Sequence, residues 1–332
     1  TNLLAHDPKY LPGYLSLGLV FEQNKQLDKA IDCYKAAIKI DPNEIKAYLS
    51  LATLYKQEKK YDEAIKIYQQ GLINNPGNHF ILSNLGNLFY LQHKYEDAII
   101  SHQRAIKSKP ESHIVHFNFA NTLLNAGKYT EAIDMYKKTI ELDPNFNRAR
   151  INLGSTLLSM SKFEEGFAEY NYRIFEDINI KSFAHKKNQL WNGQNIENKT
   201  ILVIAEEGFG NTIQFSRYLE TLSQLNCKII FKCQEELHHF FDESPYIEQI
   251  ISLDLDFNEF DYWCPLQNLI GILTPDLNTN CPFPSQLKIN DNKLLEWETL
   301  IEINNNVKIG LNWHGSPSNP RVASNSIDLK NF

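Results

Sequence analysis

Hydrophobic residues in the first half of the chain recur three or four positions apart, the spacing that places them on one face of an α-helix. This helical pattern is itself repeated, because prolines and small residues return at one fixed interval, from Pro8 to Pro42 and onward. The positions that keep the interval are Pro8, Pro42, Pro76, Pro110 and Pro144; Gly18, Ala52, Gly86, Ala120 and Gly154; and Ala30, Ala64, Ala98 and Ala132.

Each repeat predicts a pair of helices. Small residues suit places where two helices approach closely, aromatic side chains fill the gaps between them, and proline ends the second helix because it disrupts a helix interior. A single pair cannot bury its hydrophobic face, so the pairs are expected to stack into a superhelix. The predicted array occupies residues 1–180, with units near 11–44, 45–78, 79–112 and 113–146 and a degenerate unit at 147–180.

The hydrophobic pattern changes at Thr200. The run TILVIA is short, continuous and rich in β-branched residues, which is typical of a strand buried on both faces of a parallel sheet. Helix-like NTIQFSRYLETLSQL, strand-like KIIFKC and helix-like QEELHHFF follow in turn. This alternation predicts a βαβ layout, and therefore an α/β lobe after a linker at residues 181–197.

The turn after TILVIA is the first candidate ligand site. Ligands of open α/β sheets collect at the carboxyl ends of the strands, and Gly208 and Gly210 allow close backbone approach there. Asn211 and Thr212 are expected to cap the following helix, whose free N–H groups suit an anion or a polar sugar, with Gln214 within reach. The glycine pattern is incomplete as a dinucleotide fingerprint, and no P-loop follows.

Asparagines on the first helices of the repeats form the second candidate site. Asn84, Asn118 and Asn152 recur at one position of successive units, and Asn87 and Asn121 stand one turn further along. Carboxamides donate and accept hydrogen bonds at once, so such a ladder can hold an extended peptide backbone without reading its sequence. The alternative is that these asparagines pack the repeats together.

Charge and composition exclude several classes. The formal charge is −7, with 33 basic and 40 acidic residues and no basic stripe, so nucleic acid is not an expected partner. No apolar run is long enough to span a membrane, and the first residues do not form a signal peptide. The start, which lacks methionine, is interpreted as lying inside a larger chain, and five irregularly spaced cysteines favour a reducing, cytoplasmic location without a metal site.

Two resemblances add to this picture. The stretch GYLSLGLVFEQNKQLDKAIDCYKAAIKIDP and its three successors resemble the tetratricopeptide repeat family, closely over residues 11–144. From about residue 188 to the end, LWNGQNIENKTILVIAEEGFGNTIQFSRYLETL, WCPLQNL and KIGLNWHGSPSNP resemble a bacterial layout in which such an array precedes a GT-B glycosyltransferase-like domain related to the heptosyltransferases.

The second resemblance implies a fold and a reaction. A GT-B fold has two Rossmann-like lobes, so residues 198–303 would form the first lobe and residues 304–332 the start of a truncated second lobe. The reaction would be hexosyl or heptosyl transfer from a nucleotide-sugar to a hydroxyl, with no other cofactor. The repeats would recruit a protein substrate or partner, and this truncated chain alone is expected to be inactive.

Departures from the family pattern leave the chemistry open. Asn211 stands where the relatives carry the aspartate presumed to be the base, and a carboxamide cannot accept a proton at neutral pH. Either the protein is a non-catalytic interaction scaffold with a degenerate lobe, or Glu206 or Glu207 acts as the base. His314, beside Gly315 and Ser316, either holds a phosphate or acts as a base, or else makes only a local hydrogen bond.

Overall fold

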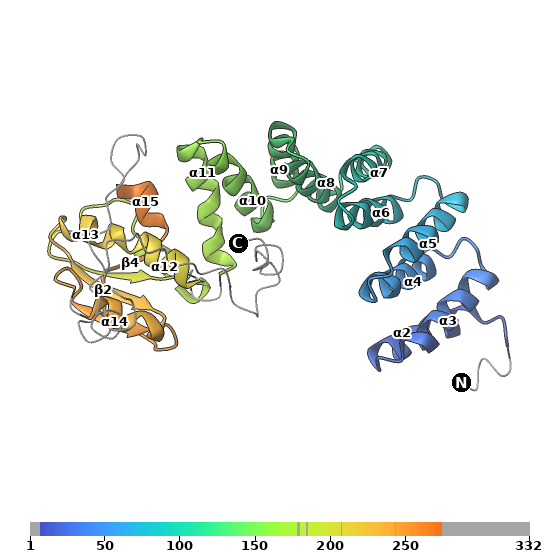
Figure 1. Cartoon of the computed structure of the whole chain (residues 1–332), viewed down its shortest axis with the longest axis horizontal. Helices are drawn as coiled ribbons and strands as arrows, with labels where there is room; N and C mark the ends of the chain where they lie inside the picture. Colours follow the sequence, from blue (N-terminus) through green and yellow to red (C-terminus); the bar gives the residue numbers. More distant parts are fainter. Residues whose placement is uncertain (1–6, 178–179, 184, 207, 243, 274–332) are drawn as a thin grey trace, which may run out of the picture. The chain divides into compact units, whose positions relative to one another are not determined.

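The computed structural model describes residues 7–273, apart from 178, 179, 184, 207 and 243. Within residues 7–170, paired helices follow one another along the chain (Figure 1). The helices are α2 (Leu11–Gln23), α3 (Leu27–Ile40), α4 (Ile45–Gln57), α5 (Tyr61–Asn74), α6 (His79–Leu91), α7 (Tyr95–Ser108), α8 (His113–Asn125), α9 (Tyr129–Leu142), α10 (Asn147–Ser159) and α11 (Phe163–Tyr170). The predicted helical repeat array is confirmed over these pairs.

The small residues at the repeat interval lie where the two helices of a unit cross. A side-chain carbon built on Gly18 would come within 2.7 Å of the Tyr34 ring, so only glycine fits beneath this tyrosine. Ala30 and Ala64 are fully buried in a core that extends continuously from the first unit into the third. Close crossing at small residues, with aromatic rings between helices, is therefore the packing rule of the array.

A second device at the same interval ends the first helix of each unit. The residues at this position all have left-handed φ values: 58° at Lys25, 59° at Lys59, 58° at His93, 77° at Gly127 and 59° at Ser161. In the first unit the Gln26 N–H donates to the Phe21 carbonyl at 2.8 Å, and the Lys25 N–H donates to the Glu22 carbonyl at 2.9 Å. These two bonds define the Schellman motif, which satisfies carbonyls at the helix end.

Exchanging glycine and lysine at this position tests its energetic weight. Because a left-handed conformation costs a non-glycine residue about 1 kcal/mol or more, Lys59→Gly is expected to stabilise the array by about 1 kcal/mol. Gly127→Lys is expected to destabilise it by a similar amount, since it brings the same strain to the fourth unit. Urea unfolding followed by circular dichroism measures both; equal signs for the two changes would contradict the explanation.

The fifth unit is a true helix pair with a tighter crossing. A side-chain carbon on Gly154 would collide with the backbone of Tyr170, and one on Gly166 would lie 2.8 Å from the Leu158 side chain. Glycine therefore replaces the usual alanine because the two backbones almost touch. The chain then passes directly into a short 3-10 helix, η1 (Asn171–Phe175), which leads toward the sheet.

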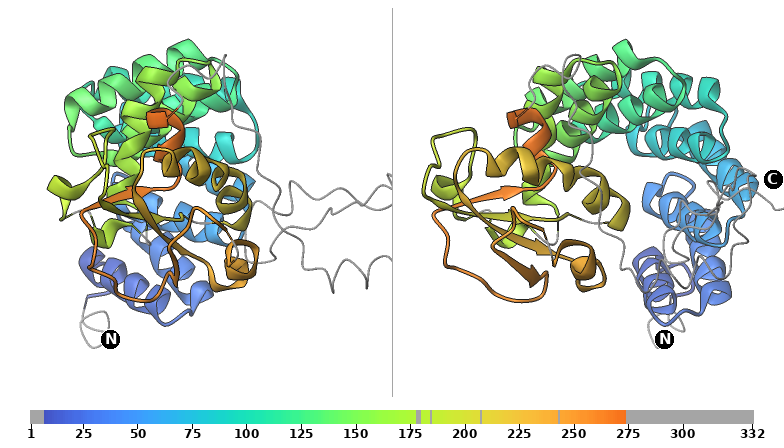
Figure 2. Two further views of the ribbon diagram at one scale, coloured as in Figure 1. Left: turned by 90° about the vertical axis from the view of Figure 1, so that its left-hand side faces the viewer. Right: turned by 60° about the vertical axis from the view of Figure 1, so that its left-hand side comes forward.

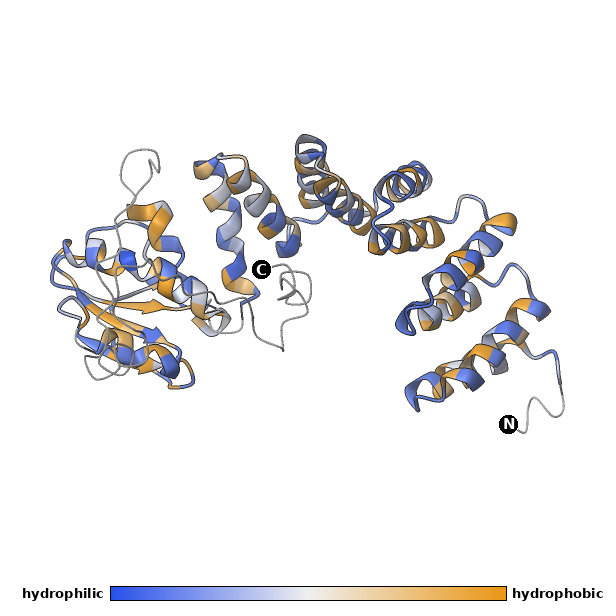
Figure 3. Cartoon of the chain, in the orientation of Figure 1, coloured by the Kyte–Doolittle hydropathy of each residue, from blue (hydrophilic) through white to orange (hydrophobic). Residues whose placement is uncertain are grey.

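The second half contains a small sheet of four parallel strands in the order β3-β2-β1-β4. The strands are largely hydrophobic (Figure 3). They are β1 (Thr200–Ile204), β2 (Lys228–Cys233), β3 (Gln249–Ser252) and β4 (Tyr262–Pro265). The helices between and after them are α12 (Phe209–Phe215), α13 (Arg217–Ser223), η4 (Glu235–Leu237), α14 (His238–Phe241) and α15 (Asn268–Leu273). The predicted βαβ layout is confirmed, although the first crossover helix is broken at Ser216.

Different elements cover the two faces of the sheet. Helices α13 and α15 contact each other and the strands from one side (Figure 2). The other side packs against the segment expected to be a linker, which contributes η2 (Lys181–Phe183) and η3 (Lys187–Gln189). Phe183 and Trp191 are 7% and 1% exposed, and the Trp191 N–H donates to the Trp263 carbonyl at 2.9 Å. Residues of this segment are thus part of the core of the lobe.

In the described part of the chain, no helix is both long and apolar enough to cross a membrane. The predicted start of a second lobe, residues 304–332, lies outside the described residues.

Candidate functional site

The strand order creates one obvious place for a ligand. From β1 the chain moves to β2 on one side of β1, whereas β4 pairs with the other side. Ligands of parallel sheets bind at such a switch point, outside the carboxyl ends of the strands. A cavity of about 350 Å³ lies there. It is lined by Tyr170, Arg173, Glu176, Asp177, Glu206, Asn211 and Gln267.

A buried guanidinium organises one wall of this cavity. Arg173 lies on η1 and is 7% exposed, and its Nε donates to Glu206 Oε1 at 2.5 Å. One terminal nitrogen donates to Asn268 Oδ1 at 2.6 Å, and the guanidinium carbon lies 4.6 Å from the centroid of the Tyr170 ring. This single side chain therefore connects the end of the repeat array to β1 and to α15.

Glu206 is already engaged at both carboxylate oxygens. It is 3% exposed, Oε1 accepts from Arg173, and Oε2 accepts from the Gln267 N–H at 2.9 Å. These bonds tie the end of β1 to the turn after β4 and to η1. The geometry shows a carboxylate that holds three segments together; a role as a base stays a prediction, and Glu207 lies outside the described residues.

The glycine loop differs from its predicted geometry in one respect. Gly208 precedes α12 with φ of 95°, and Asn211 and Thr212 lie inside the first turn, so the prediction that they cap the helix is wrong. Thr212 is 1% exposed and its hydroxyl donates to Gln234 Oε1 at 2.9 Å. Gln234 Nε2 in turn donates to the Glu206 carbonyl at 3.1 Å, which fixes the loop from behind.

Asn211 lines the cavity, whereas Gln214 is exposed on α12. Gly210 is exposed as well, and a side-chain carbon placed on it would meet open space. Of the residues predicted to form this site, the structure therefore brings Glu206 and Asn211 to one cavity, with Gly208 and Thr212 shaping the loop. His314, Gly315 and Ser316 lie outside the described residues.

The two glycines of the loop are expected to respond differently to substitution. Gly208→Ala places a side chain on a backbone with positive φ and is expected to cost about 1 to 3 kcal/mol. Gly210→Ala lies within α12, where alanine is the better helix former, and is expected to be neutral or slightly stabilising. Urea unfolding followed by the fluorescence of buried Trp191 and Trp263 measures both; equal losses would contradict the assigned backbone roles.

The electrostatics of the cavity favour cationic or uncharged ligands. Its lining contains three carboxylates, Glu176, Asp177 and Glu206, against one cation, Arg173, whose charge is paired with Glu206. An anion such as a diphosphate would meet a surplus of negative charge, carried by the exposed Glu176 and the half-buried Asp177. Hydroxyl groups can instead hydrogen-bond to carboxylates and carboxamides.

Hydrogen bonds of the array asparagines support the alternative that these residues pack the repeats together. Asn118 Nδ2 donates to Ser83 Oγ at 3.3 Å and Asn152 Nδ2 donates to Asn121 Oδ1 at 2.9 Å, so both link successive first helices. Asn121 Oδ1 also accepts from the Tyr136 hydroxyl at 2.7 Å. Asn84 Nδ2 donates to the Phe80 carbonyl within its own helix at 3.0 Å.

Each carboxamide nevertheless keeps hydrogen-bonding capacity. The bonds above use one N–H of Asn84, Asn118 and Asn152 and only the oxygen of Asn121, and a carboxamide offers two N–H groups and two lone pairs. Asn87 is half-buried on α6 beside this row. Gripping a peptide and bridging the repeats are therefore compatible roles.

Sequence reasoning missed the residues that build the cavity wall. Arg173, Gln267 and Asn268 come from the repeat end and from the turn after β4, and Asn268 is 95 residues from Arg173. Their individual patterns are unremarkable. A weak indication was present in the degenerate fifth unit, because an arginine among the hydrophobic residues of NYRIF has to find a partner if it is buried.

Comparisons with known proteins agree with the fold of the first half. A family model described as the tetratricopeptide repeat protein 21 C-terminal ARM domain matches residues 1–153. The first half of the chain is a tetratricopeptide-like repeat array. The match ends before the sheet, and no curated protein matches the chain.

Several solved structures each match about half of the chain. The MamA protein is 22% identical, with 53% of this chain and 94% of MamA covered and a TM-score of 0.45. PilF of Pseudomonas aeruginosa is 21% identical, with 54% and 86% covered and a TM-score of 0.45. YrrB, a TPR protein with an unusual peptide-binding site, is 21% identical, with 56% and 97% covered and a TM-score of 0.44.

Proposed function

We propose that the chain is a protein-binding scaffold whose array holds an extended partner segment along the first helices of its third to fifth units. Repeats of this type imply protein–protein interaction, and stacked repeats offer long continuous binding surfaces. The observation that carries the proposal is an exposed hydrophobic side chain one turn before each of two carboxamides. Phe80 precedes Asn84 on α6 and is 55% exposed, and Ile114 precedes Asn118 on α8 and is 44% exposed.

Residues four apart lie on the same side of a helix, so each of these helices presents one hydrophobic and one carboxamide group together. Hydrophobic side chains of a partner can pack on Phe80 and Ile114. The carboxamides then hydrogen-bond to the backbone of the partner, because its N–H and C=O groups lose their hydrogen bonds to water when they are covered. This combination supports affinity for a peptide without strict sequence reading.

Peptide selection on the full chain tests the proposal. Random displayed peptides of about 16 residues are selected, and the winners are titrated as labelled synthetic peptides against variants. Phe80→Ala with Ile114→Ala is expected to weaken binding at least about tenfold. Ile100→Ala, which removes a 55% exposed isoleucine on the second helix α7, is the matched control and is expected to leave binding unchanged. Equal effects of both variants would contradict the proposal.

A second candidate is the glycosyl transfer that the sequence resemblance implies for a longer protein. Its support is the parallel order β3-β2-β1-β4, which suits one Rossmann-like lobe, together with the cavity at the switch point. The carboxylates of that cavity suit the hydroxyls of an acceptor better than the diphosphate of a donor. Donor binding would then depend on residues outside this lobe.

Calorimetric titration of UDP-, ADP- and GDP-sugars into the longest available form of the protein tests this candidate. Saturable binding of one donor, weakened by Gly208→Val, would support transfer chemistry that uses this loop. No binding of any donor would leave the scaffold as the function, with the lobe as a structural or interaction domain. Transfer activity by the present chain alone would contradict the expectation that it is inactive.

A further inference from the structure

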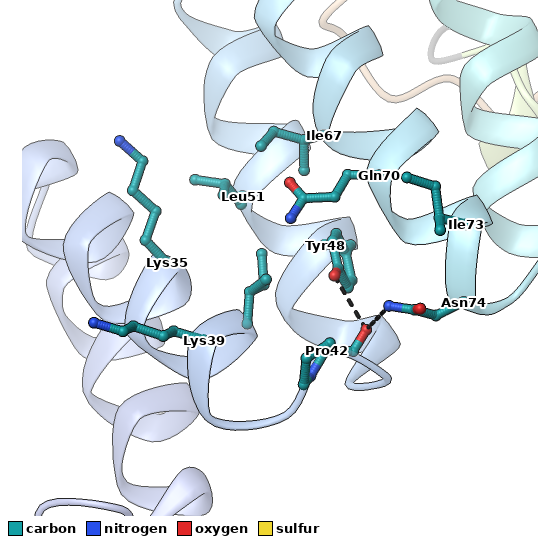
Figure 4. Close-up of a pocket in the computed structure, with 10 residues that line it drawn as sticks. Lys35, Lys39, Pro42, Tyr48, Leu51, Ile67, Gln70, Ile73 and Asn74 are labelled. Carbon is teal, nitrogen blue, oxygen red and sulfur yellow. Dashed lines mark hydrogen bonds between the residues drawn. The ribbon is translucent and has the colours of Figure 1, made fainter.

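A cavity on the array lies between the second helices of its first two units, away from the carboxamide row. It measures about 560 Å³ and is formed between α3 and α5, with α4 beneath (Figure 4). Its floor is Tyr48 and Leu51, both 0% exposed, and Ile67 and Ile73 form the wall on α5. We name this feature the α3–α5 groove; its lining is Lys35, Ile38, Lys39, Pro42, Tyr48, Leu51, Ile67, Gln70, Ile73 and Asn74.

The groove is held open by fixed hydrogen bonds. The Tyr48 hydroxyl donates to the Pro42 carbonyl at 3.1 Å, and Asn74 Nδ2 donates to the same carbonyl at 3.0 Å (Figure 4). These bonds connect the turn between the first two units to α4 and α5. Because the Tyr48 ring is fully buried and its hydroxyl is anchored, the floor is preformed rather than produced by a ligand.

Of the four regular units, only the second carries isoleucine at both wall positions. Ile73 is 78% exposed, the most exposed large hydrophobic side chain in the described part of the chain. At the equivalent positions of the next unit, Ser101 replaces Ile67 and Lys107 replaces Ile73. The repeat architecture therefore does not require these isoleucines, and an exposed hydrophobic wall of this kind marks an interaction surface.

Positive charge lies along one side of the groove. Lys35 and Lys39 are exposed on the second half of α3, and their ammonium groups point outward from the cavity (Figure 4). Within the described residues, neither lysine forms an ion pair with a carboxylate. Lys66 adds a third exposed cation on α5, and no acidic residue lies on α3 after Asp32 or on α5 after Glu63. The lining of the groove therefore contains two lysines and no carboxylate, and Asp41, in the turn next to Pro42, is the acidic residue that acts on Tyr48.

We propose that the α3–α5 groove docks an acidic segment of a partner protein. A large hydrophobic side chain of the segment enters between Ile67 and Ile73, and flanking carboxylates pair with Lys35 and Lys39. The exposed carboxamide of Gln70 donates to and accepts from the backbone of the segment at the mouth of the groove, and the side-chain oxygen of Asn74 accepts from it. This site is independent of the carboxamide row on the first helices, so the array carries two docking surfaces.

The test uses the full chain with the first surface disabled. Random displayed peptides of about 12 residues are selected on a chain carrying Phe80→Ala and Ile114→Ala, and the winners are measured by fluorescence anisotropy. The expected winners combine aspartate or glutamate with leucine, isoleucine or phenylalanine, and Ile73→Asp is expected to weaken them at least about tenfold. Ile100→Asp on α7 is the matched control, because it places the same charge on another exposed isoleucine, outside the groove.

Charge reversal distinguishes docking of an acidic segment from non-specific hydrophobic binding. Lys35→Glu combined with Lys39→Glu is expected to abolish binding of the acidic peptides and to admit their lysine-substituted versions. Winners without acidic residues, or binding that survives both Ile73→Asp and charge reversal, would overturn the proposal. Self-association of the wild-type chain in sedimentation, abolished by Ile73→Asp, would also overturn it, because the occupant would then be a second copy. None of these results depends on whether the first surface binds peptides, because Phe80→Ala and Ile114→Ala are present during selection.

Discussion

Replacing Arg173 by methionine is expected to lower the free energy of unfolding of the α/β lobe by about 3 to 5 kcal/mol, because it leaves a buried carboxylate without its cation. Arg173 and Glu206 are 7% and 3% exposed, so water in the cavity beside them compensates only in part for the lost partner. The change also removes the hydrogen bond to Asn268, and with it a direct connection between η1 and α15. The sheet should therefore unfold at markedly lower urea concentration.

Fluorescence of Trp191 and Trp263, both buried in the lobe, reports this transition separately from the helical signal of the array. Arg148→Met, at an exposed position of α10, is the matched control and is expected to change stability by less than about 0.5 kcal/mol. The double variant Arg173→Met with Glu206→Met should recover much of the loss, since no buried charge is then left unpaired. A loss for the single variant no larger than that of Arg148→Met would contradict the proposed role of the pair.

The array is expected to lose stability in mild acid because of one buried histidine. His102 occupies the position held by Tyr34, Tyr68 and Tyr136 in the other units, and it is 0% exposed. Neither ring nitrogen has a hydrogen-bond partner, and burial lowers the pKa of His102 to about 4. The folded array therefore holds this imidazole neutral, whereas the unfolded chain protonates it near its ordinary pKa of 6.5.

The direction of the effect follows from proton binding. Between pH 6.5 and pH 4 the unfolded chain binds a proton that the folded chain does not, so stability is full above pH 6.5 and declines as the pH falls toward 4. The total loss from this group is about 3 kcal/mol at about 1.4 kcal/mol per pH unit. Urea midpoints measured by circular dichroism at several pH values give the slope.

His102→Phe supplies the comparison for this slope. Phenylalanine keeps a ring beneath Gly86 and beside Phe119 but cannot be protonated. Acid still destabilises this variant through its carboxylates, so the difference between the two pH profiles isolates His102. Parallel profiles for the two proteins would show that His102 is not the acid-sensitive group.

The repeats could be predicted because their signals are local and periodic. Proline, glycine and alanine at one interval fix the boundaries and the crossings of the helix pairs, and the hydrophobic run of β1 identifies the sheet. The linker at 181–197 could not be recognised as part of the lobe core, because it lacks any period. Phe183 and Trp191 are buried there by irregular backbone, which leaves no repeated pattern in the sequence.

The candidate site was only half visible in the sequence. Gly208 and Glu206 follow a recognisable strand, so their place at the carboxyl edge of the sheet could be inferred. Arg173 meets Asn268 only because the last repeat packs against the lobe, and a single sequence does not reveal a contact between such distant residues. The groove between α3 and α5 was not predicted from the sequence for a similar reason, since Lys35 and Ile73 belong to different units.

The most direct test of the scaffold function is site-specific photo-crosslinking of a selected peptide to the full chain. Benzoylphenylalanine replaces Phe80 on α6 in one variant and Ile100 on α7 in the matched control, two positions of equal exposure. If the first helices hold the partner segment, the peptide crosslinks at position 80 and not at position 100. Equal crosslinking at both positions, or crosslinking at position 100 alone, would contradict the assignment of the binding surface.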